Sequence, residues 1–426
     1  MKIAIVGGGI AGNMAAALLH ASHDITLFEA DRRLGGHVHT HEVERFGRRY
    51  AVDTGFIVYN ERTYPRFTRL LQQLGVATQE SEMSFSLRCE RSGLEYNGAS
   101  LDTLFAQRAN LLRPSFIGMV RDILRFHREA RRLLDTPGDE VPLGEILERG
   151  RYGRGFVENY IVPMGAAIWS TDPGSMLLFP ARFFVRFLDN HGMLTVNRRP
   201  VWRTVSGGSM RYVERLTAAF RDRVRLATPV RSLQRVTGGV VVHPRGAAPQ
   251  RFDAVFVACH SDQALAMLAD PSPLEREALG AIGYQQNEAV LHTDATLMPR
   301  RKRAWASWNY HRLAHDRSAL ALTYDMSRLQ RLASPEPFLV TLNRTSQVDP
   351  RRVIARMTYH HPLFTPAAVA AQALHARLNH ARTFFCGAYW GFGFHEDGVA
   401  SAMAAVDHFD AVHGVGGGAM RQLASA

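Results

Sequence analysis

The feature that most constrains this chain is a short apolar segment that runs directly into three spaced glycines. Residues 3–6 read Ile-Ala-Ile-Val, and Gly7, Gly9 and Gly12 follow as G-x-G-x-x-G. At this spacing the first glycine allows a tight strand-to-helix turn, the second lets a ligand approach the backbone, and the third lets the helix pack on the strand. The N-terminus of such a helix attracts phosphate. The pattern predicts a β-α-β unit that binds a dinucleotide, with an ordinary glycine-rich turn as the alternative.

A second predicted strand, residues 25–28, ends in an acid. Glu29 lies 20 residues after Gly9, where a carboxylate can accept hydrogen bonds from ribose hydroxyls and disfavours a 2′-phosphate. No second G-x-G-x-x-G opens another helix. We therefore expect one dinucleotide other than NADP, and no separate NAD(P)H domain.

Length, cysteine content and charge narrow the class of protein. At 426 residues the chain is long enough for two domains, and it has no apolar run that could span a membrane. Cys89, Cys259 and Cys386 show no C-x-x-C spacing, so we expect a reduced, cytoplasmic protein without a metal site. The net charge of +12, carried almost entirely by arginine, predicts a basic surface that attracts anionic lipid. Nucleic acid is not expected, because no recognition motif for it is present.

The order of predicted elements indicates an α/β fold. A strand-helix-strand pattern opens the chain, strand chemistry returns in its middle, and a strand and a helix close it. We predict a Rossmann-like cofactor domain built from separated stretches, with an inserted α+β substrate domain. The expected cofactor domain comprises residues 1–65, 200–270 and 380–413, the substrate domain 66–199 and 271–379, and a flexible tail 414–426.

Residues 115–134 have the pattern of a basic amphipathic helix. Apolar residues recur at helical spacing, and four arginines form a stripe opposite them at positions 121, 125, 128 and 132. Two interpretations stay open. The helix packs on its own domain with a solvated arginine face, or it contacts the surface of an anionic membrane.

Three motifs together carry a family resemblance over essentially the whole chain. They are the glycine motif with Glu29, then Arg33-x-Gly35-Gly36-His37-x-x-Thr40, and finally Gly387 followed by Gly393-x-x-Glu396. The chain resembles the flavin amine oxidase, protoporphyrinogen oxidase and phytoene desaturase superfamily. The phrases at residues 53–60, 305–310 and 393–398 are similar to those of a bacterial group often encoded beside cyclopropane-fatty-acid synthase. Members of that group are linked to desaturation of methyl-branched acyl chains.

The resemblance implies a noncovalently bound FAD, because the cysteine-containing attachment motif is missing. It also implies an amine oxidase-like form of the FAD-binding domain. The cofactor-binding residues that the motifs and the resemblance together indicate are Gly7, Gly9, Ile10, Ala11, Gly12, Glu29, Ala30, Arg33, Gly35, Gly36, His37, Thr54, Gly55, Phe56, Val230, Gly387, Phe394, Glu396, Gly398 and Val399.

The chain departs from the family pattern at several positions. His37 stands where arginine is usual, and Phe394 stands where amine oxidases place a tyrosine of their aromatic cage. The stretch 284–292 lacks the lysine that amine oxidases keep near flavin N5, and Lys302 lies in an arginine-rich loop. These departures argue against a conventional amine oxidase.

Few side chains are candidates for chemistry beyond the flavin itself, which accepts the hydride. His395 is the first candidate for handling a proton, because its motif places it beside the flavin and imidazole titrates near neutrality. A histidine that only hydrogen-bonds within its turn is the alternative. Phe394, His292 and Glu288 are the further catalytic candidates.

We therefore expect an FAD-dependent desaturase or oxidase that acts on an apolar, lipid-like substrate such as a modified fatty acyl chain. Its electrons would pass to oxygen or a quinone. A flavin amine oxidase without the usual lysine, a redox-neutral flavin isomerase, and a noncatalytic flavoprotein that docks on a membrane are the alternatives.

Overall fold

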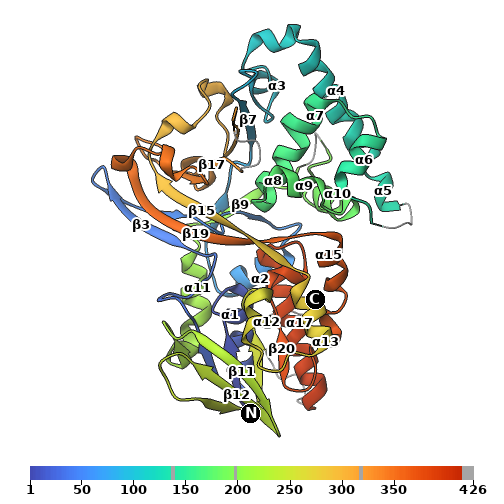
Figure 1. The fold of residues 1–426 in the computed structure, drawn as a ribbon. Coiled ribbons are helices and arrows are strands. Elements are labelled where there is room, and N and C mark those ends of the chain that lie inside the picture. Colours follow the sequence, from blue (N-terminus) through green and yellow to red (C-terminus); the bar gives the residue numbers. More distant parts are fainter. Residues whose placement is uncertain (136–139, 196–198, 316–319, 415–426) are drawn as a thin grey trace.

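The computed structural model describes residues 1–135, 140–195, 199–315 and 320–414. Two layered regions meet across the middle of the molecule (Figure 1). The lower region holds a parallel sheet with its helices, and the upper region holds a long antiparallel sheet beside a lobe of helices. The predicted flexible tail falls almost entirely on residues 415–426, which lie outside the described residues.

The lower region is built on a five-stranded parallel sheet with the order β10-β2-β1-β14-β20. Its strands are β1 (Lys2–Val6), β2 (Asp24–Phe28), β10 (Val224–Arg225), β14 (Ala254–Val257) and β20 (Thr383–Phe385). All five come from the stretches predicted to form the cofactor domain, although the exact domain boundaries stay a prediction.

Both faces of this sheet are covered, as its apolar strands require. Ile3 and Ile5 face a cluster that includes helices α1, α2, α11 and α17, whereas Ala4 and Val6 face the antiparallel sheet β11-β12-β13. The bounds of these elements are α1 (Ile10–Leu19), α2 (Pro65–Gln73), α11 (Met210–Thr217), α17 (His395–His413), β11 (Val230–Val236), β12 (Gly239–Pro244) and β13 (Gln250–Phe252).

The upper region contains a seven-stranded sheet with the order β19-β15-β18-β17-β16-β7-β8. Neighbouring strands are antiparallel except β16 and β7, which run parallel. The strands are β7 (Phe85–Cys89), β8 (Glu95–Asn97), β15 (Gly283–His292), β16 (Trp308–Arg312), β17 (Leu322–Asp325), β18 (Leu339–Leu342) and β19 (Val353–Leu363). The long strands β15 and β19 reach down to the lower region (Figure 1).

Smaller elements join the two regions. The hairpin of β3 (Thr40–Arg45) and β4 (Arg48–Asp53) and the sheet of β5 (Tyr59–Asn60), β9 (Trp202–Val205) and β6 (Thr78–Glu80) lie between them. The remaining helices of these regions are α12 (Ser261–Met267), α13 (Pro273–Gly280), α14 (Met326–Leu329), α15 (Pro366–Gln372) and α16 (His375–Leu378).

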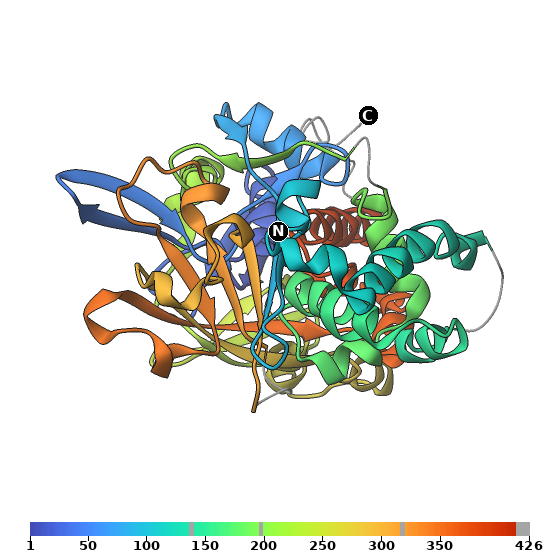
Figure 2. The same cartoon turned by 90° about the horizontal axis from the view of Figure 1, so that it is seen from above.

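The helical lobe lies on one side of the seven-stranded sheet, as the view from above shows (Figure 2). It comprises α3 (Leu101–Leu104), α4 (Pro114–Glu129), α5 (Arg132–Asp135), α6 (Leu143–Arg149), α7 (Arg154–Phe156), α8 (Val162–Trp169), α9 (Pro173–Leu177) and α10 (Ala181–Asn190). Lobe and sheet share one apolar core.

The predicted amphipathic helix over residues 115–134 is shorter than expected. Helix α4 ends at Glu129, and α5 begins at Arg132 after a turn. Its apolar face, which includes Phe116, Met119 and Phe126, is buried in the core of the lobe. No helix of the described residues is both long and apolar enough to cross a membrane.

Candidate functional site

The glycine motif forms an open turn between β1 and α1. Gly7 has a φ of +106°, and a Cβ placed there would lie 2.7 Å from the carbonyl oxygen of Ala258. A Cβ on Gly12 would lie 1.8 Å from the carbonyl oxygen of Gly7, so the helix can pack against the turn only with glycine there. Space within 4 Å of Gly9 is empty on its side-chain side. The turn therefore fits a phosphate group at the N-terminus of α1.

Glu29 lies beside this turn, at the end of β2. Its carboxylate accepts hydrogen bonds from the backbone N–H of Gly8 at 2.6 Å and of Asp31 at 2.8 Å. These bonds hold one acid at the edge of the dinucleotide cradle, where ribose hydroxyls would be bound.

A second wall comes from the loop at residues 33–37. The Arg33 guanidinium donates to the carbonyl oxygens of Val38 at 2.7 Å and Gly36 at 2.9 Å, so it braces the loop from behind. A Cβ on Gly36 would lie 3.2 Å from the α-carbon of Gly9, and one on Gly55 would lie 2.0 Å from the carbonyl oxygen of His37. Close backbone contacts thus bring this loop against the turn.

The third wall is the segment that enters α17. The Gly387 N–H donates to Ser401 Oγ at 2.9 Å, and the Trp169 indole N–H donates to the Phe392 carbonyl at 3.0 Å. A Cβ on Gly398 would lie 2.7 Å from Ile10 Cγ2, so glycine lets the start of α17 pack on the start of α1. Two helix N-termini therefore lie side by side at the same cradle.

These walls enclose a cavity of about 790 Å³ that continues up to the seven-stranded sheet and the helical lobe. Most of the cofactor-binding residues indicated by the sequence line it. They are Gly7, Gly9, Ile10, Ala11, Glu29, Ala30, Gly35, Gly36, His37, Thr54, Gly55, Phe56, Val230, Gly387 and Phe394, and the catalytic candidate His395 lines it as well.

Five of the indicated cofactor residues do not line the cavity. Gly12, Gly398 and Val399 pack the helices, and Arg33 braces its loop. The Glu396 carboxylate turns to α2, where it accepts from the backbone N–H of Arg66 at 3.2 Å and of Phe67 at 3.0 Å. The Glu396 carboxylate thus holds the start of α2, and its direct contact with the cofactor stays a prediction.

His395 is held tightly between aromatic and polar neighbours. Its ring stacks on Phe56 with a centroid distance of 3.5 Å, and its Nε2 shares a hydrogen bond of 3.0 Å with the hydroxyl of Tyr212. Burial lowers the pKa of His395 to about 3, so the ring is neutral at physiological pH. These contacts suit a positioning residue better than a group that exchanges protons.

His292 and Glu288 lie on β15 but away from the cavity. His292 Nε2 contacts Thr341 Oγ1 at 2.7 Å and its Nδ1 accepts from the Asp294 N–H at 3.0 Å, so both ring nitrogens have structural partners. Glu288 is exposed. Neither residue lines the cavity, and we assign neither a catalytic role.

Several lining residues were not singled out from the sequence. Tyr359 and His361 on β19, with Tyr284 and His260, border the cavity. The Tyr359 hydroxyl lies 2.8 Å from Thr54 Oγ1, which links β19 to the segment that follows β4. The alternation Tyr359-x-His361 has the period of a strand and places both side chains on one face of it. Which face borders the cavity depends on the tertiary fold, so the sequence alone does not identify these two residues.

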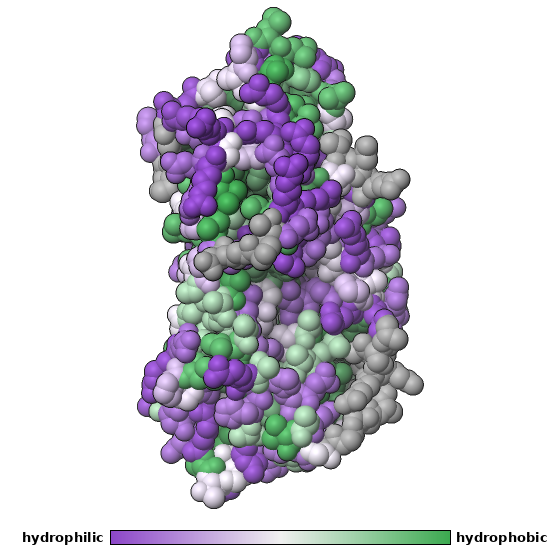
Figure 3. Space-filling view, turned by 90° about the vertical axis from the view of Figure 1, so that its right-hand side faces the viewer, coloured by the Kyte–Doolittle hydropathy of each residue, from purple (hydrophilic) through white to green (hydrophobic). Residues whose placement is uncertain are grey.

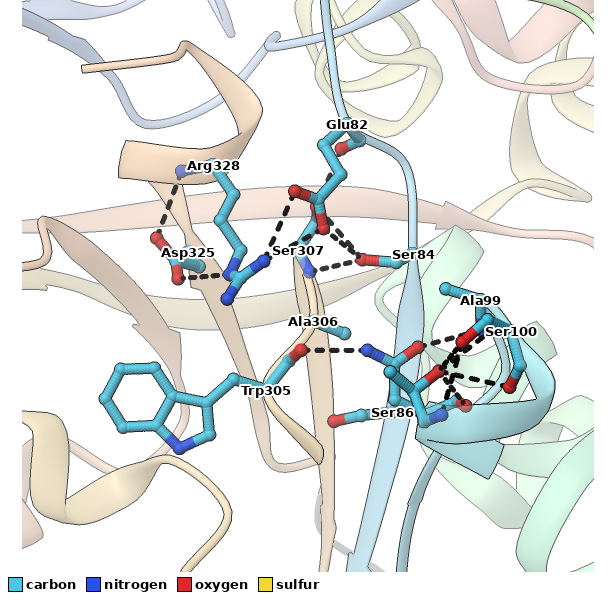
Figure 4. Close-up of polar contacts among 12 residues, drawn as sticks. Glu82, Ser84, Ser86, Ala99, Ser100, Trp305, Ala306, Ser307, Asp325 and Arg328 are labelled. Carbon is cyan, nitrogen blue, oxygen red and sulfur yellow. Dashed lines mark hydrogen bonds and ion pairs between the residues drawn. The ribbon is translucent and has the colours of Figure 1, made fainter. Parts of the chain in front are cut away.

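The sheet side of the cavity is positioned by a polar cluster at the start of β16 (Figure 4). The Ser307 N–H donates to Ser84 Oγ at 2.9 Å, its hydroxyl donates to the Glu82 carbonyl at 2.6 Å, and Arg328 pairs with Glu82 at 3.1 Å. The next residue, Trp308, lines the cavity with its indole edge-on to Tyr324. The sequence phrase at residues 305–310 thus positions the cavity wall.

The helical side of the cavity is an aromatic wall. Phe394 stacks on Phe187 at a centroid distance of 5.1 Å, and Trp169 packs against Phe187 at 4.6 Å. Because Trp169 also binds the Phe392 carbonyl, α8, α10 and the turn before α17 are fixed together. Phe394 is therefore held by aromatic packing within the wall of the cavity.

Comparisons with known proteins identify this arrangement. The model of the family described as flavin containing amine oxidoreductase matches residues 13–306. The cyclohexylamine oxidase of Brevibacterium oxydans is 15% identical with a TM-score of 0.71, over 97% of this chain and 99% of that one. A putrescine oxidase bound to putrescine is 16% identical with a TM-score of 0.67, over 96% and 99%. A CLA-producing fatty acid isomerase from P. acnes is 17% identical with a TM-score of 0.66, over 96% and 98%.

At these identities the solved structures show a shared fold, which confirms the predicted α/β architecture with a Rossmann-like FAD-binding domain. The family match covers more than half of the chain and confirms the resemblance seen in the motifs. The chain belongs to the flavin-containing amine oxidoreductase family, and it is an FAD-dependent oxidoreductase.

Proposed function

We propose that this protein oxidises an apolar, lipid-like substrate, such as a modified fatty acyl chain, by removing a hydride. The observation that carries the proposal is the chemistry of the cavity beyond the cofactor cradle. The lining residues from the helical lobe, the loop that follows it and strands β16 to β18 are all uncharged: Ile168, Ser170, Phe187, Met193, Trp308, Tyr324 and Leu342. Such a wall favours an uncharged, apolar substrate, because burying an unpaired charge there is costly.

The same wall argues against an amine held by an acid or handled by a lysine. Among the described residues that line the cavity, the only acids are Glu29 and Asp31, which flank the dinucleotide turn. The only two lysines of the chain, Lys2 and Lys302, are both exposed and lie outside the cavity. An ammonium group would therefore find no counter-charge on the substrate side.

The cofactor side is proposed to hold FAD noncovalently. The backbone of Gly7 and Gly9 and the N-termini of α1 and α17 would face the diphosphate, and Glu29 would bind the ribose of the adenosine half. When bound, FAD supplies the two-electron chemistry by accepting a hydride equivalent. The electrons would then pass to oxygen or a quinone.

The protein's own contribution is orientation and exclusion of water. Phe394 and Phe187 would restrict the acyl chain to one path past the cofactor. His395, neutral and fixed by Phe56 and Tyr212, would position the neighbouring flavin ring without exchanging a proton. Phe394 and His395 would thus contact the reacting region and act as positioning residues.

An anaerobic titration tests this function. The absorbance of oxidised flavin is followed while bacterial phospholipid extract is added, with an amine panel in parallel. Bleaching by lipid alone is the expected result. Bleaching by amines alone would contradict the proposal. Conversion of a lipid double bond without net bleaching would instead point to a redox-neutral isomerase.

We also propose that the outer face of α4 and the short 3-10 helix before it (Arg108–Leu112) contact an anionic membrane. Leu111 and Leu112 are 53% and 87% exposed, and Ile117 and Leu124 are 44% and 54% exposed. On α4 the latter two alternate with exposed Arg121 and Arg128 at helical spacing. Figure 3 shows hydrophobic residues among the hydrophilic surface of the helical lobe. Apolar insertion flanked by arginine suits an anionic headgroup layer.

A further inference from the structure

His37 lies beside the turn that would receive the cofactor diphosphate. The preceding residue, Gly36, abuts the α-carbon of Gly9, and the carbonyl oxygen of His37 abuts Gly55. The residue lines the cavity between these two contacts. His37 is therefore part of the cavity wall beside the turn that leads into α1.

The ring of His37 is surrounded by other rings rather than by acids. It stacks on Tyr359 at a centroid distance of 5.1 Å, meets His361 edge-on at 5.3 Å, and faces His260 at 6.4 Å. Burial, the imidazoles of His361, His260 and His395, and the Arg33 guanidinium all lower the pKa of His37 well below its ordinary value. No carboxylate is among the groups that shift it.

Fixed positive charge is scarce at this position. Among the described residues that line the cavity, the arginines are Arg231 and Arg245, on β11 and the turn after β12, and neither is among the charged groups that shift the His37 pKa. The Arg33 guanidinium already binds two backbone carbonyls and pairs with Asp31 at 3.4 Å. A diphosphate in the cradle would thus meet two helix dipoles and a neutral imidazole.

We propose that His37 takes up a proton when the diphosphate of FAD binds, and that it thereby makes cofactor retention depend on pH. A nearby anion favours the imidazolium form, so the His37 pKa is higher in the loaded protein than in the empty one. By linkage, FAD binds most tightly below the pKa of the empty protein. Its affinity falls by up to about tenfold per pH unit between the two pKa values and is constant above the higher one.

Retention of FAD can be measured without knowing which substrate the protein oxidises. The test uses the holoprotein, diluted at pH values from acidic to mildly alkaline while the fluorescence of released FAD is measured. We expect the FAD dissociation constant of the wild type to rise with pH over part of this range. Acid unfolding would release FAD in the opposite direction, so the two effects are distinguishable.

Two substitutions at His37 test whether this residue takes up the proton. His37→Arg supplies a permanent charge and should bind FAD tightly with no pH dependence, and His37→Asn should bind weakly with no pH dependence. His292→Asn, at a buried histidine outside the cavity, should keep the wild-type slope. If His37→Asn does not fold, as judged by circular dichroism, His37→Arg alone decides.

Three results would overturn the proposal. They are a wild-type dissociation constant that does not change with pH, a pH slope that survives in the His37 variants, and a slope that is lost in His260→Asn but kept in His37→Asn. The last result would place the proton on His260 instead.

Discussion

The two halves of the cavity are built by different means. In the proposed cofactor half, Gly7, Gly9 and Gly36 leave room for a ligand beside the backbone, and two helix N-termini would supply the polarity. The proposed substrate half is lined by residues such as Phe187 and Trp308, which bring no charge to that wall. Backbone cradles suit a cofactor common to a whole family, whereas a side-chain wall can be changed residue by residue to select a substrate.

The largest effect is expected where the backbone cradle is closed. Gly12→Ala places a Cβ 1.8 Å from the Gly7 carbonyl oxygen, so α1 must shift and the phosphate turn must open. We expect loss of bound FAD and a fall of about 3 kcal/mol in the free energy of unfolding. Flavin absorbance of the purified protein and urea denaturation measure the two effects.

The control for that variant is Gly118→Ala on α4, where a new Cβ meets nothing within 4 Å. It should keep FAD and gain about 0.5–1 kcal/mol, because alanine is the better helix former. Full FAD occupancy in Gly12→Ala would contradict the importance of the close packing at this turn.

The next effect concerns the charge of the substrate half. Met193→Glu introduces a carboxylate into the uncharged wall, while Met193→Gln changes shape in the same way without the charge. We expect lipid-dependent bleaching to slow by about 100-fold in the glutamate variant, from a desolvation cost of roughly 3 kcal/mol. The glutamine variant should be far less affected. Equal rates in the two variants would show that charge does not govern substrate choice.

Acid stability should reflect three histidines whose rings are shielded from water in the folded protein. Burial lowers the pKa of His191, His292 and His361 to about 4. The unfolded chain therefore binds more protons, and stability is lost as pH falls from about 6.5 towards 4, by up to about 1.4 kcal/mol per pH unit for each ring. Urea denaturation at several pH values should show this slope, and His292→Gln should reduce it by one ring's share. An unchanged slope would contradict the assignment.

The smallest effect is expected at the proposed membrane face. Leu112→Asp should weaken binding to vesicles of phosphatidylglycerol and phosphatidylcholine by several-fold, since one exposed leucine contributes on the order of 1–2 kcal/mol on insertion. Leu226→Asp, at a 42% exposed leucine on the dinucleotide side, is the matched control. Vesicle sedimentation measures both. Equal losses in the two variants would show that the surface at Leu112 has no special role in membrane binding.

The sequence predicts the cofactor half better than the substrate half. Glycines at fixed spacing have a geometric meaning that does not depend on the rest of the fold, so Gly7, Gly9 and Glu29 could be placed at once. Glu396 could not, because its partners at residues 66 and 67 are more than 300 positions away. The sequence predicts a stripe of arginines opposite the apolar face of the helix at residues 115–134, and the structure shows that Ile117 and Leu124 are exposed on this helix as well.

The substrate half depends on long-range packing that local patterns do not encode. The sequence indicates His292 and Glu288 as catalytic candidates in the stretch 284–292, yet neither lines the cavity once β15 is placed in the sheet. Tyr359 and His361 line the cavity, and the strand that carries them, β19, pairs with β15 along its full length. Such contacts become visible only once the strands are assembled.

The most direct test of the uncharged substrate half is anaerobic reduction by two ligands of equal length. One is the methyl ester of a methyl-branched fatty acid, and the other is the corresponding branched alkylamine, which is protonated at neutral pH. We expect the ester to bleach the flavin and the amine to do so at least about tenfold more slowly. Faster bleaching by the amine would contradict it and would make this protein an amine oxidase that works without a lysine at its cavity.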